Sequence, residues 1–99
     1  MKLVYTEQAL FSFKEMLAFM RLKVSHNKLI LIRDKILDKA ELLIKNPFLG
    51  QKEELLAPLG LQHRRLIVDH CKIIYRIENG IIFITDIFDS RQDPKKMNG

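Results

Sequence analysis

The chain has 99 residues, which is enough for one hydrophobic core and too few for two. Hydrophobic residues make up 47% of it and charged residues 29%, a balance that predicts a folded globular domain and excludes a disordered chain. The single cysteine, Cys71, excludes an internal disulfide, and the N-terminal segment reaches Glu7 without the sustained apolar run of a signal peptide. We therefore expect one domain over residues 1–99, in the cytoplasm and without a membrane span.

The charge is unbalanced. Seventeen Lys and Arg residues against twelve Asp and Glu residues give a net charge of +5 and an isoelectric point near 9.5. An excess of positive charge favours acidic partners, either nucleic acid or an acidic polypeptide. Many basic domains of this size bind nothing anionic, so the placement of the charges matters more than their sum.

The first part of the chain predicts a short strand followed by a helix. Residues 2–5 are apolar β-formers, and Thr6 is suited to cap the N-terminus of a helix. Apolar residues then recur at helical spacing, at Leu10, Phe13, Leu17, Met20 and Val24. Phe11, Met16 and Phe19 fall outside this stripe. The helix therefore has either a broad core face or an apolar face that meets a partner.

A second helix should follow directly. Ser25 and Asn27 supply capping side chains. The second apolar stripe consists of Leu29, Ile32, Ile36, Ala40 and Leu43. This helix should stop before Pro47, and the two helices together predict a helical hairpin. The next stretch contains two prolines and two glycines up to Gly60, so we expect a loop of about 15 residues that is either functional or faces a partner.

The last third of the chain predicts three antiparallel strands. The segments LQHRRLIV, CKIIYRI and IIFITDIF are rich in β-branched and aromatic residues and are separated by turn signals. Asn79-Gly80 favours a tight hairpin turn, and Asp69-His70 is a weaker candidate for the preceding turn. The polar segment 92–99 should leave the sheet and form a flexible tail. The expected fold is α+β, with an N-terminal strand, a helical hairpin and a three-stranded meander in one sheet.

No motif for a cofactor or a metal is present. The glycines match neither a dinucleotide fingerprint nor a phosphate-binding loop. His26, His63 and His70 lack partners at metal-ligand spacing, and Cys71 beside His70 is not a zinc pattern. Neighbouring residues on a strand point to opposite faces, so Cys71 and His70 are poorly placed to act as a nucleophile and its base. We expect no cofactor and no metal, and we interpret Cys71 as a small, partly buried residue.

The remaining candidates for chemistry are cations. Five of them lie on or beside the predicted C-terminal strands: Arg64, Arg65, Lys72, Arg76 and Arg91. Residues of one parity on antiparallel neighbours cluster on one face of a sheet, and Lys72 and Arg76 share parity. On the face away from the helices, such a cluster would bind phosphate. The alternative is an ordinary solvated face, with Arg91 held by an ion pair to Asp89 or Asp93.

The order of elements resembles that of the RelE/ParE superfamily of toxins, over nearly the whole chain. The segments that carry the resemblance are KIIYRI, IIFITDIF and the closing DSRQDP, which is similar to the ending of these toxins, where an arginine follows the last strand. This resemblance implies the toxin of a type II toxin-antitoxin module, forming a hetero-oligomer with a cognate antitoxin. The C-terminal segment of such an antitoxin would fold onto the toxin and bury its apolar grooves. Phe11, Phe19 and Arg76 are the residues we expect to bind a partner.

The two branches of the superfamily imply different activities. Similarity to RelE implies a ribosome-dependent mRNA endoribonuclease, with Arg64, Arg65, Lys72 and Arg91 as candidate catalytic residues that stabilise the scissile phosphate. Met97 occupies the place where such an enzyme carries a tyrosine or histidine, so its acid-base residue is missing. The ending is closer to the ParE branch, which inhibits growth by contact with DNA gyrase and needs no catalytic residue.

Whether the chain is an enzyme therefore stays open at this stage. A further alternative is a non-toxic module that binds nucleic acid or protein on the same fold.

Overall fold

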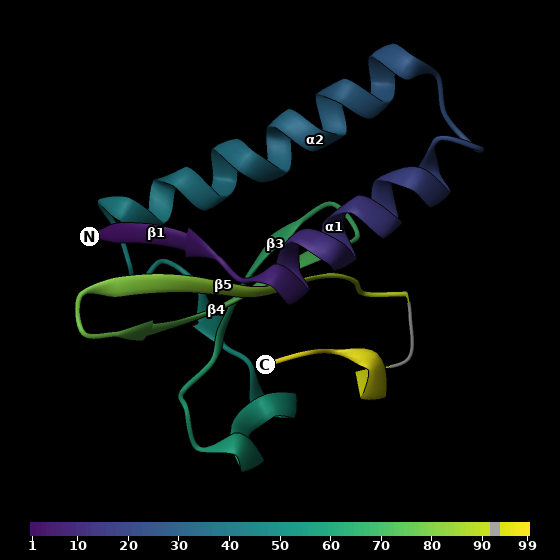
Figure 1. The fold of residues 1–99 in the computed structure, drawn as a ribbon. Coiled ribbons are helices and arrows are strands. Elements are labelled where there is room, and N and C mark those ends of the chain that lie inside the picture. The colour runs from purple at the N-terminus through teal and green to yellow at the C-terminus, as the bar shows by residue number, and fades with distance from the viewer. Residues whose placement is uncertain (92–93) are drawn as a thin grey trace.

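The computed structural model describes residues 1–91 and 94–99 (Figure 1). The helices and strands in chain order are β1 (Lys2–Tyr5), α1 (Glu7–Met20), α2 (His26–Glu41), β2 (Gln51–Lys52), β3 (Arg64–Val68), β4 (Cys71–Glu78) and β5 (Ile81–Asp89). Short 3-10 turns lie at η1 (Leu42–Ile44), η2 (Glu54–Leu59) and η3 (Pro94–Lys96). The predicted α+β class, helical hairpin and C-terminal meander are confirmed.

The strands form one mixed sheet in the order β1-β5-β4-β3-β2. The N-terminal strand β1 runs parallel to β5, and the other neighbours are antiparallel. At the turn between β4 and β5, Asn79 and Gly80 both have positive φ, at 52° and 75°, as the predicted hairpin turn requires. Asp69 has a φ of 55° in the turn between β3 and β4, so the weaker turn prediction is also confirmed.

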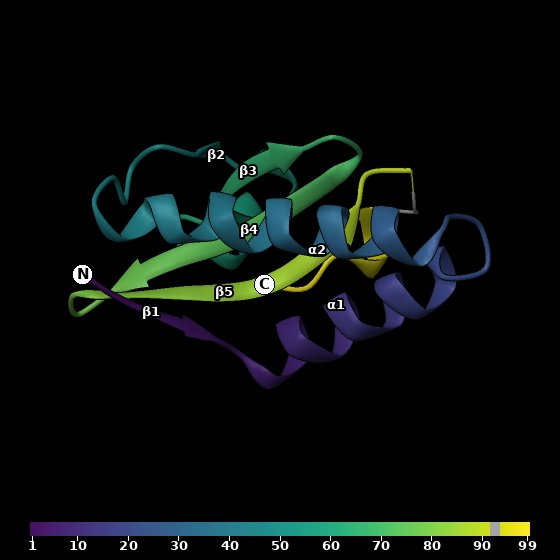
Figure 2. The same cartoon turned by 90° about the horizontal axis from the view of Figure 1, so that it is seen from above.

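Both helices pack on the same face of the sheet (Figures 1 and 2). As predicted, the Thr6 side chain caps α1 by accepting a hydrogen bond from the backbone of the next turn, and Ser25 does the same for α2. The stripe predicted for α1 was wrong at Leu10, which is 53% exposed, whereas Ala9 is fully buried. The small side chain of Ala9 lets the helix approach β5 closely, and this turns Leu10 outward.

The segment predicted as a loop contains regular structure. Gln51 and Lys52 pair with Arg65 and Arg64 to form β2, a fifth strand at the edge of the sheet. The turn η2 follows, with Pro58 inside it. The prediction failed because a two-residue strand has no hydrophobic period of its own and exists only through its tertiary pairing. Proline looked like a breaker but is tolerated within this short 3-10 turn.

A β-bulge in β5 changes which side chains face the helices. Ile74 of β4 pairs with Asp86, but the next residue, Tyr75, pairs with Ile84, so Thr85 is an extra residue in β5. An extra residue reverses the alternation of side chains beyond it. Before the bulge the even-numbered Ile82 and Ile84 face the helices, and after it Ile87 takes that place.

The opposite face of the sheet carries a second, smaller cluster formed by Leu56, Ile74, Phe88 and Met97. Residues 94–99 run back across this face (Figure 1). Although we expected residues 92–99 to form a flexible tail, residues 94–99 make defined contacts with the sheet. Residues 92 and 93 lie outside the part of the chain that the structure describes.

Candidate functional site

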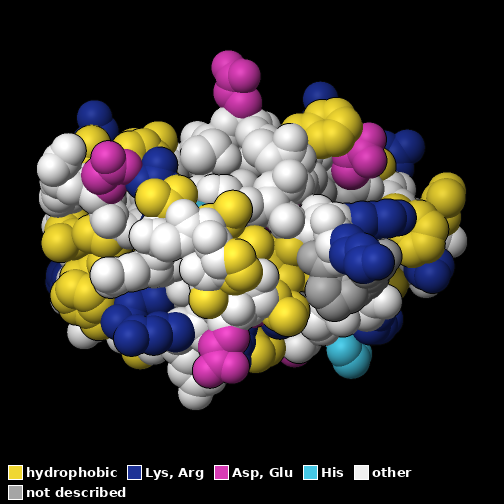
Figure 3. Space-filling view, turned by 90° about the horizontal axis from the view of Figure 1, so that it is seen from below, with side chains coloured by type: hydrophobic (Ala, Val, Ile, Leu, Met, Phe, Trp, Pro, Cys, Tyr) yellow, Lys and Arg dark blue, Asp and Glu magenta, His cyan; other side chains and the backbone are white. Residues whose placement is uncertain are grey.

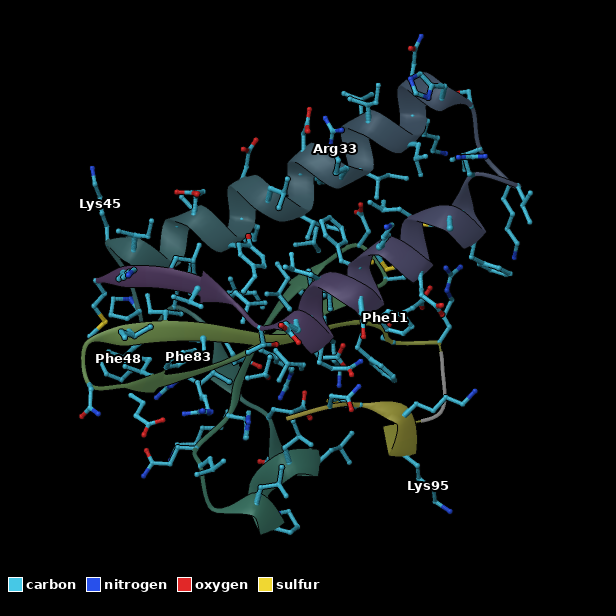
Figure 4. All side chains as sticks on the ribbon, viewed as in Figure 1. Phe11, Arg33, Lys45, Phe48, Phe83 and Lys95 are labelled. Carbon is cyan, nitrogen blue, oxygen red and sulfur yellow. The ribbon has the colours of Figure 1, made fainter. Side chains whose placement is uncertain are left out.

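A groove opens where α1 and the C-terminal segment flank the second half of β5. The strand β1 ends at Tyr5, opposite Ile84, so α1 takes over as the neighbour of β5 beyond that point. The groove has a volume of about 420 Å³. We call it the tail groove; its lining includes Phe11, Phe19, Asp86, Phe88, Lys96 and Asn98. Figure 4 shows the Phe11 side chain leaving α1 on the side of the C-terminal segment.

Phe11 and Phe19, the predicted partner contacts, are both at the surface. Their side chains are 58% and 59% exposed, so neither belongs to a broad core face of α1. Exposed phenylalanines beside a groove are typical of protein interaction sites. Their exposure meets the requirement of the docking hypothesis, and their role in binding stays a prediction.

A second groove, of about 380 Å³, lies between the helices and the sheet, beside the turn that connects α1 and α2. We call it the hairpin groove; its apolar lining includes Phe19, Ile32, Ile36 and Val68. Its charged lining consists of Lys23, Lys28 and Arg91 together with Asp69 and Asp89, which leaves one excess positive charge. Phe19 lines both grooves and therefore connects them. The Lys23 ammonium lies 4.4 Å from the centre of the Phe19 ring, a cation-π contact at the junction.

Arg91 is tied to Asp89. Its Nη2 lies 2.7 Å from Asp89 Oδ2, and its Nε donates to Oδ1 over 3.0 Å. The hydrogen bonds from Arg91 lower the pKa of the Asp89 carboxyl, and the carboxylate in turn raises the pKa of the guanidinium. This is the structural ion pair that the sequence left open. The other partner considered, Asp93, lies outside the described residues.

Arg64 and Arg65 are neighbours on β3 and point to opposite faces of the sheet. Arg64 Nη1 donates to the backbone oxygen of Gly50 over 2.7 Å. On the other face, Arg65 and Lys72 flank Glu53, which is only 3% exposed. Lys72 Nζ and Arg65 Nη1 lie 3.2 and 3.8 Å from Glu53 Oε2. The two cations therefore share one buried carboxylate, which offsets one of their two positive charges.

Arg76 shares a face with Lys72, as predicted, but the two are separated by the buried Ile74 of the second cluster. Arg76 forms an ion pair with Glu78 and lies 4.9 Å from the centre of the Phe83 ring, which is labelled in Figure 4. Figure 3 looks at the molecule from below and shows the Lys and Arg side chains in separate groups, with hydrophobic side chains between them. The predicted cations do not form one continuous positive surface there.

Comparison with known proteins decides the family. The family model described as "ParE toxin of type II toxin-antitoxin system, parDE" matches residues 3–94. The chain belongs to the ParE toxin family. The predicted superfamily and the preference for the ParE branch are therefore confirmed.

A solved structure entitled "Chromosomal ParDE TA system from P. aeruginosa" is similar to this ParE-family toxin, with a TM-score of 0.75 and 17% sequence identity. The match covers 90% of this chain and 95% of that one, and it supports the fold. No curated protein matches the chain.

One imidazole of this ParE-family toxin lies near Arg91, which the sequence did not suggest. From the sequence, His70 was considered only as a metal ligand and as a base for Cys71, and Met97, at the place of a tyrosine or histidine, is 7% exposed in the second cluster. However, the turn between β3 and β4 brings His70 beside the end of β5, where its backbone oxygen accepts from the Ser90 backbone and hydroxyl over 2.7 and 2.8 Å. His70 and Arg91 both line the hairpin groove. The turn signal at Asp69-His70 could have located it.

The thiol of the ParE-family toxin is buried. Cys71 is 5% exposed, and burial raises the pKa of its thiol to about 11. Its Sγ lies 3.4 Å from Met16 Sδ, so the interpretation as a buried structural residue is supported.

Among the described residues, no group of three His, Cys, Asp or Glu side chains is arranged to hold a metal ion. Within the same residues, no helix has the length and apolar content needed to cross a bilayer.

Proposed function

We propose that this chain is a cytoplasmic toxin that inhibits growth by contact with DNA gyrase and is neutralised by a cognate antitoxin. The observation that carries the proposal is the ParE family match over residues 3–94. The similar solved structure is entitled a toxin-antitoxin system, which supports an antitoxin partner. The net charge of +5 favours a partner with acidic residues.

The geometry of the cations supports action by contact. Each of the five predicted cations is bonded within the protein, to a carboxylate or to a backbone oxygen. A phosphate would have to compete with these partners at every one of them. Catalysis of RNA cleavage needs preorganised donors directed at the scissile phosphate together with an acid-base residue.

The two grooves offer a docking surface for the antitoxin. A bound segment would place apolar side chains against Phe11 and Phe19 and acidic side chains near Lys23, Lys28 and Arg91. An amphipathic segment in an apolar groove with a charged rim is a common mode of recognition. We therefore assign the antitoxin to the tail and hairpin grooves, with Phe19 at the centre of the contact.

Inducible expression in a bacterium tests the proposal, with DNA supercoiling and messenger RNA integrity followed as growth slows. We expect growth arrest with loss of negative supercoiling and intact messenger RNA, and relief of the arrest when the antitoxin is co-expressed. Arg91→Ala should retain the arrest. Arg33→Ala is its matched control, because Arg33 is also an exposed arginine paired with an adjacent carboxylate, that of Asp34.

An mRNA endoribonuclease similar to RelE is the second candidate, with Arg64, Arg65, Lys72 and Arg91 as its catalytic residues. The position of His70 in the same groove as Arg91 favours this candidate. Messenger RNA cut within codons, together with loss of cutting in His70→Ala, would replace the gyrase proposal by this one. Normal growth on expression of the folded protein would instead indicate a non-toxic binding module.

A further inference from the structure

One wall of the tail groove is a short segment near the C-terminus. Lys96 and Asn98 line the groove across from Phe11 and Phe19 of α1. A helix is held by its own hydrogen bonds, but a segment of six residues needs external contacts to stay in place. The shape of the groove therefore depends on what holds residues 94–99 against the sheet.

Polar contacts attach this segment: one is to Asp86, and another joins His63 Nε2 to the Gly99 oxygen over 3.0 Å. Asp86 makes the contact at Asn98, which lines the groove. The side chain of Asp86 is 1% exposed, and its Oδ2 accepts a hydrogen bond from the backbone N–H of Asn98 over 2.8 Å. The Asn98 side-chain amide lies 3.4 Å from the same oxygen, and Oδ1 accepts from the backbone N–H of Ile87 over 2.9 Å. Burying a carboxyl group is costly unless it is hydrogen-bonded. Release of the segment would remove both Asn98 donors from Asp86.

Met97 supplies the apolar part of this attachment. It is 7% exposed and packs with Leu56, Ile74 and Phe88 on the face of the sheet opposite the helices. Phe88 also lines the tail groove, so a single side chain contacts both the docked segment and the space where a partner would lie. A change in the position of Met97 would therefore act on Phe88, which lines the groove.

The β-bulge explains why Asp86 is available for this role. If β5 alternated regularly through Thr85, Asp86 would share the face of Ile82 and Ile84 and would point toward the helices. The bulge turns Asp86 toward the C-terminal segment and leaves Ile87 to fill the core. Bulges commonly redirect one side chain at a functional position.

We propose that Asp86 is a positioning residue that latches residues 94–98 as a wall of the tail groove, so that antitoxin binding and docking of the segment stabilise each other. This inference rests on the proposed function, because the occupant of the groove is the antitoxin segment. The tail groove continues through Phe19 into the hairpin groove, where Lys23, Lys28 and Arg91 outnumber Asp69 and Asp89 by one charge, and this suits an acidic segment with apolar anchors.

Linkage makes the proposal quantitative. If release of the segment lowers the affinity for the antitoxin by some factor, then antitoxin binding must favour the docked segment by the same factor. Couplings of this kind commonly amount to about 10-fold or more. The Asn98 amide hydrogen reports the docked state directly, since it is the donor to Asp86.

Two pairs of variants in the C-terminal segment distinguish loss of docking of this segment from loss of folding. Asn98→Pro removes the backbone N–H that donates to Asp86 over 2.8 Å. Its control Asn98→Ala keeps this N–H and loses only the longer side-chain contact of 3.4 Å. Met97→Asp removes the apolar anchor, whereas Met97→Leu keeps it. These positions lie outside the main core, so circular dichroism should show a retained fold for all four variants.

The experiment combines hydrogen exchange of residues 94–99 with titration of the cognate antitoxin. We expect rapid exchange of the segment and about 10-fold weaker antitoxin binding in Asn98→Pro and Met97→Asp, with both controls close to wild type. In the wild-type complex, exchange of the Asn98 amide should slow by the same factor. Equal affinity in all four variants, or unchanged exchange on binding, would overturn the latch.

The two proposals fail in different ways. If wild-type protein binds no antitoxin, the proposed function fails. In that case the latch is still judged in the free protein, because a freely exchanging Asn98 amide in the wild type would refute it.

Discussion

Replacing Phe19 with aspartate should weaken the antitoxin complex strongly and leave the toxin folded. Phe19 is 59% exposed, and a phenylalanine side chain of ~200 Å² then leaves about 120 Å² for a partner to cover. At about 25 cal/mol per Å² this surface contributes about 3 kcal/mol when it is fully covered, which corresponds to an affinity loss of about 100-fold. Isothermal titration of the purified toxin with its antitoxin measures this loss.

The control for Phe19→Asp is Leu31→Asp. Leu31 lies on α2, is 69% exposed and lines neither groove, so its replacement should change the affinity less than about 2-fold. Urea unfolding should place both variants within about 0.5 kcal/mol of the wild type, since exposed positions contribute little to stability. Equal binding by wild type and Phe19→Asp would refute the docking surface, and unfolding of Phe19→Asp would place Phe19 in the core.

Three further predictions concern the groups whose environment the structure defines. Tyr75→Phe removes a hydroxyl that makes two hydrogen bonds to the turn at 47–50. It accepts from the Gly50 backbone N–H over 2.9 Å and donates to the Pro47 backbone oxygen over 2.8 Å. Urea unfolding should therefore show that the free energy of unfolding falls by about 2 kcal/mol with an unchanged m-value. A decrease below ~0.5 kcal/mol would show that these two hydrogen bonds do not stabilise the fold. Cys71 should react with a disulfide reagent about 100-fold more slowly in the native protein than in denaturant, because burial raises its pKa to about 11, and equal rates would show an accessible thiolate. Arg91→Ala should raise the pKa of Asp89, as measured by an NMR titration. Because the ion pair lowers this pKa in the folded state, it stabilises the fold above pH ~3.9. This stabilisation is lost as the pH falls through the pKa of Asp89 in the folded protein. An unchanged Asp89 titration would refute the ion pair.

The elements with strong local signals were predictable from the sequence. The caps at Thr6 and Ser25 and the turn at Asn79-Gly80 are formed by residues whose backbone and side-chain chemistry acts within a few positions. The stripe of α2 was also correct at its centre, where Ile36 and Ala40 are buried. Helix starts and hairpin turns of this kind depend on local interactions and need no tertiary contacts.

The features that depend on tertiary contacts were not predictable. The strand β2 exists because β3 offers it a partner, and no period marks its two residues. The extra residue Thr85 cannot be recognised in a strand of alternating apolar residues, so the orientation of Asp86 was missed. The same limit applies to Glu53, whose burial between Arg65 and Lys72 turned an expected phosphate site into an internal ion-pair network.

A supercoiling assay with purified components shows whether this ParE-family chain acts by contact with gyrase. Relaxed plasmid, ATP and gyrase are incubated with increasing toxin, with and without the antitoxin. We expect a loss of supercoiling that the antitoxin reverses and that is the same in His70→Ala. Full supercoiling at saturating toxin, together with cleavage of ribosome-bound messenger RNA by the same preparation, would contradict it.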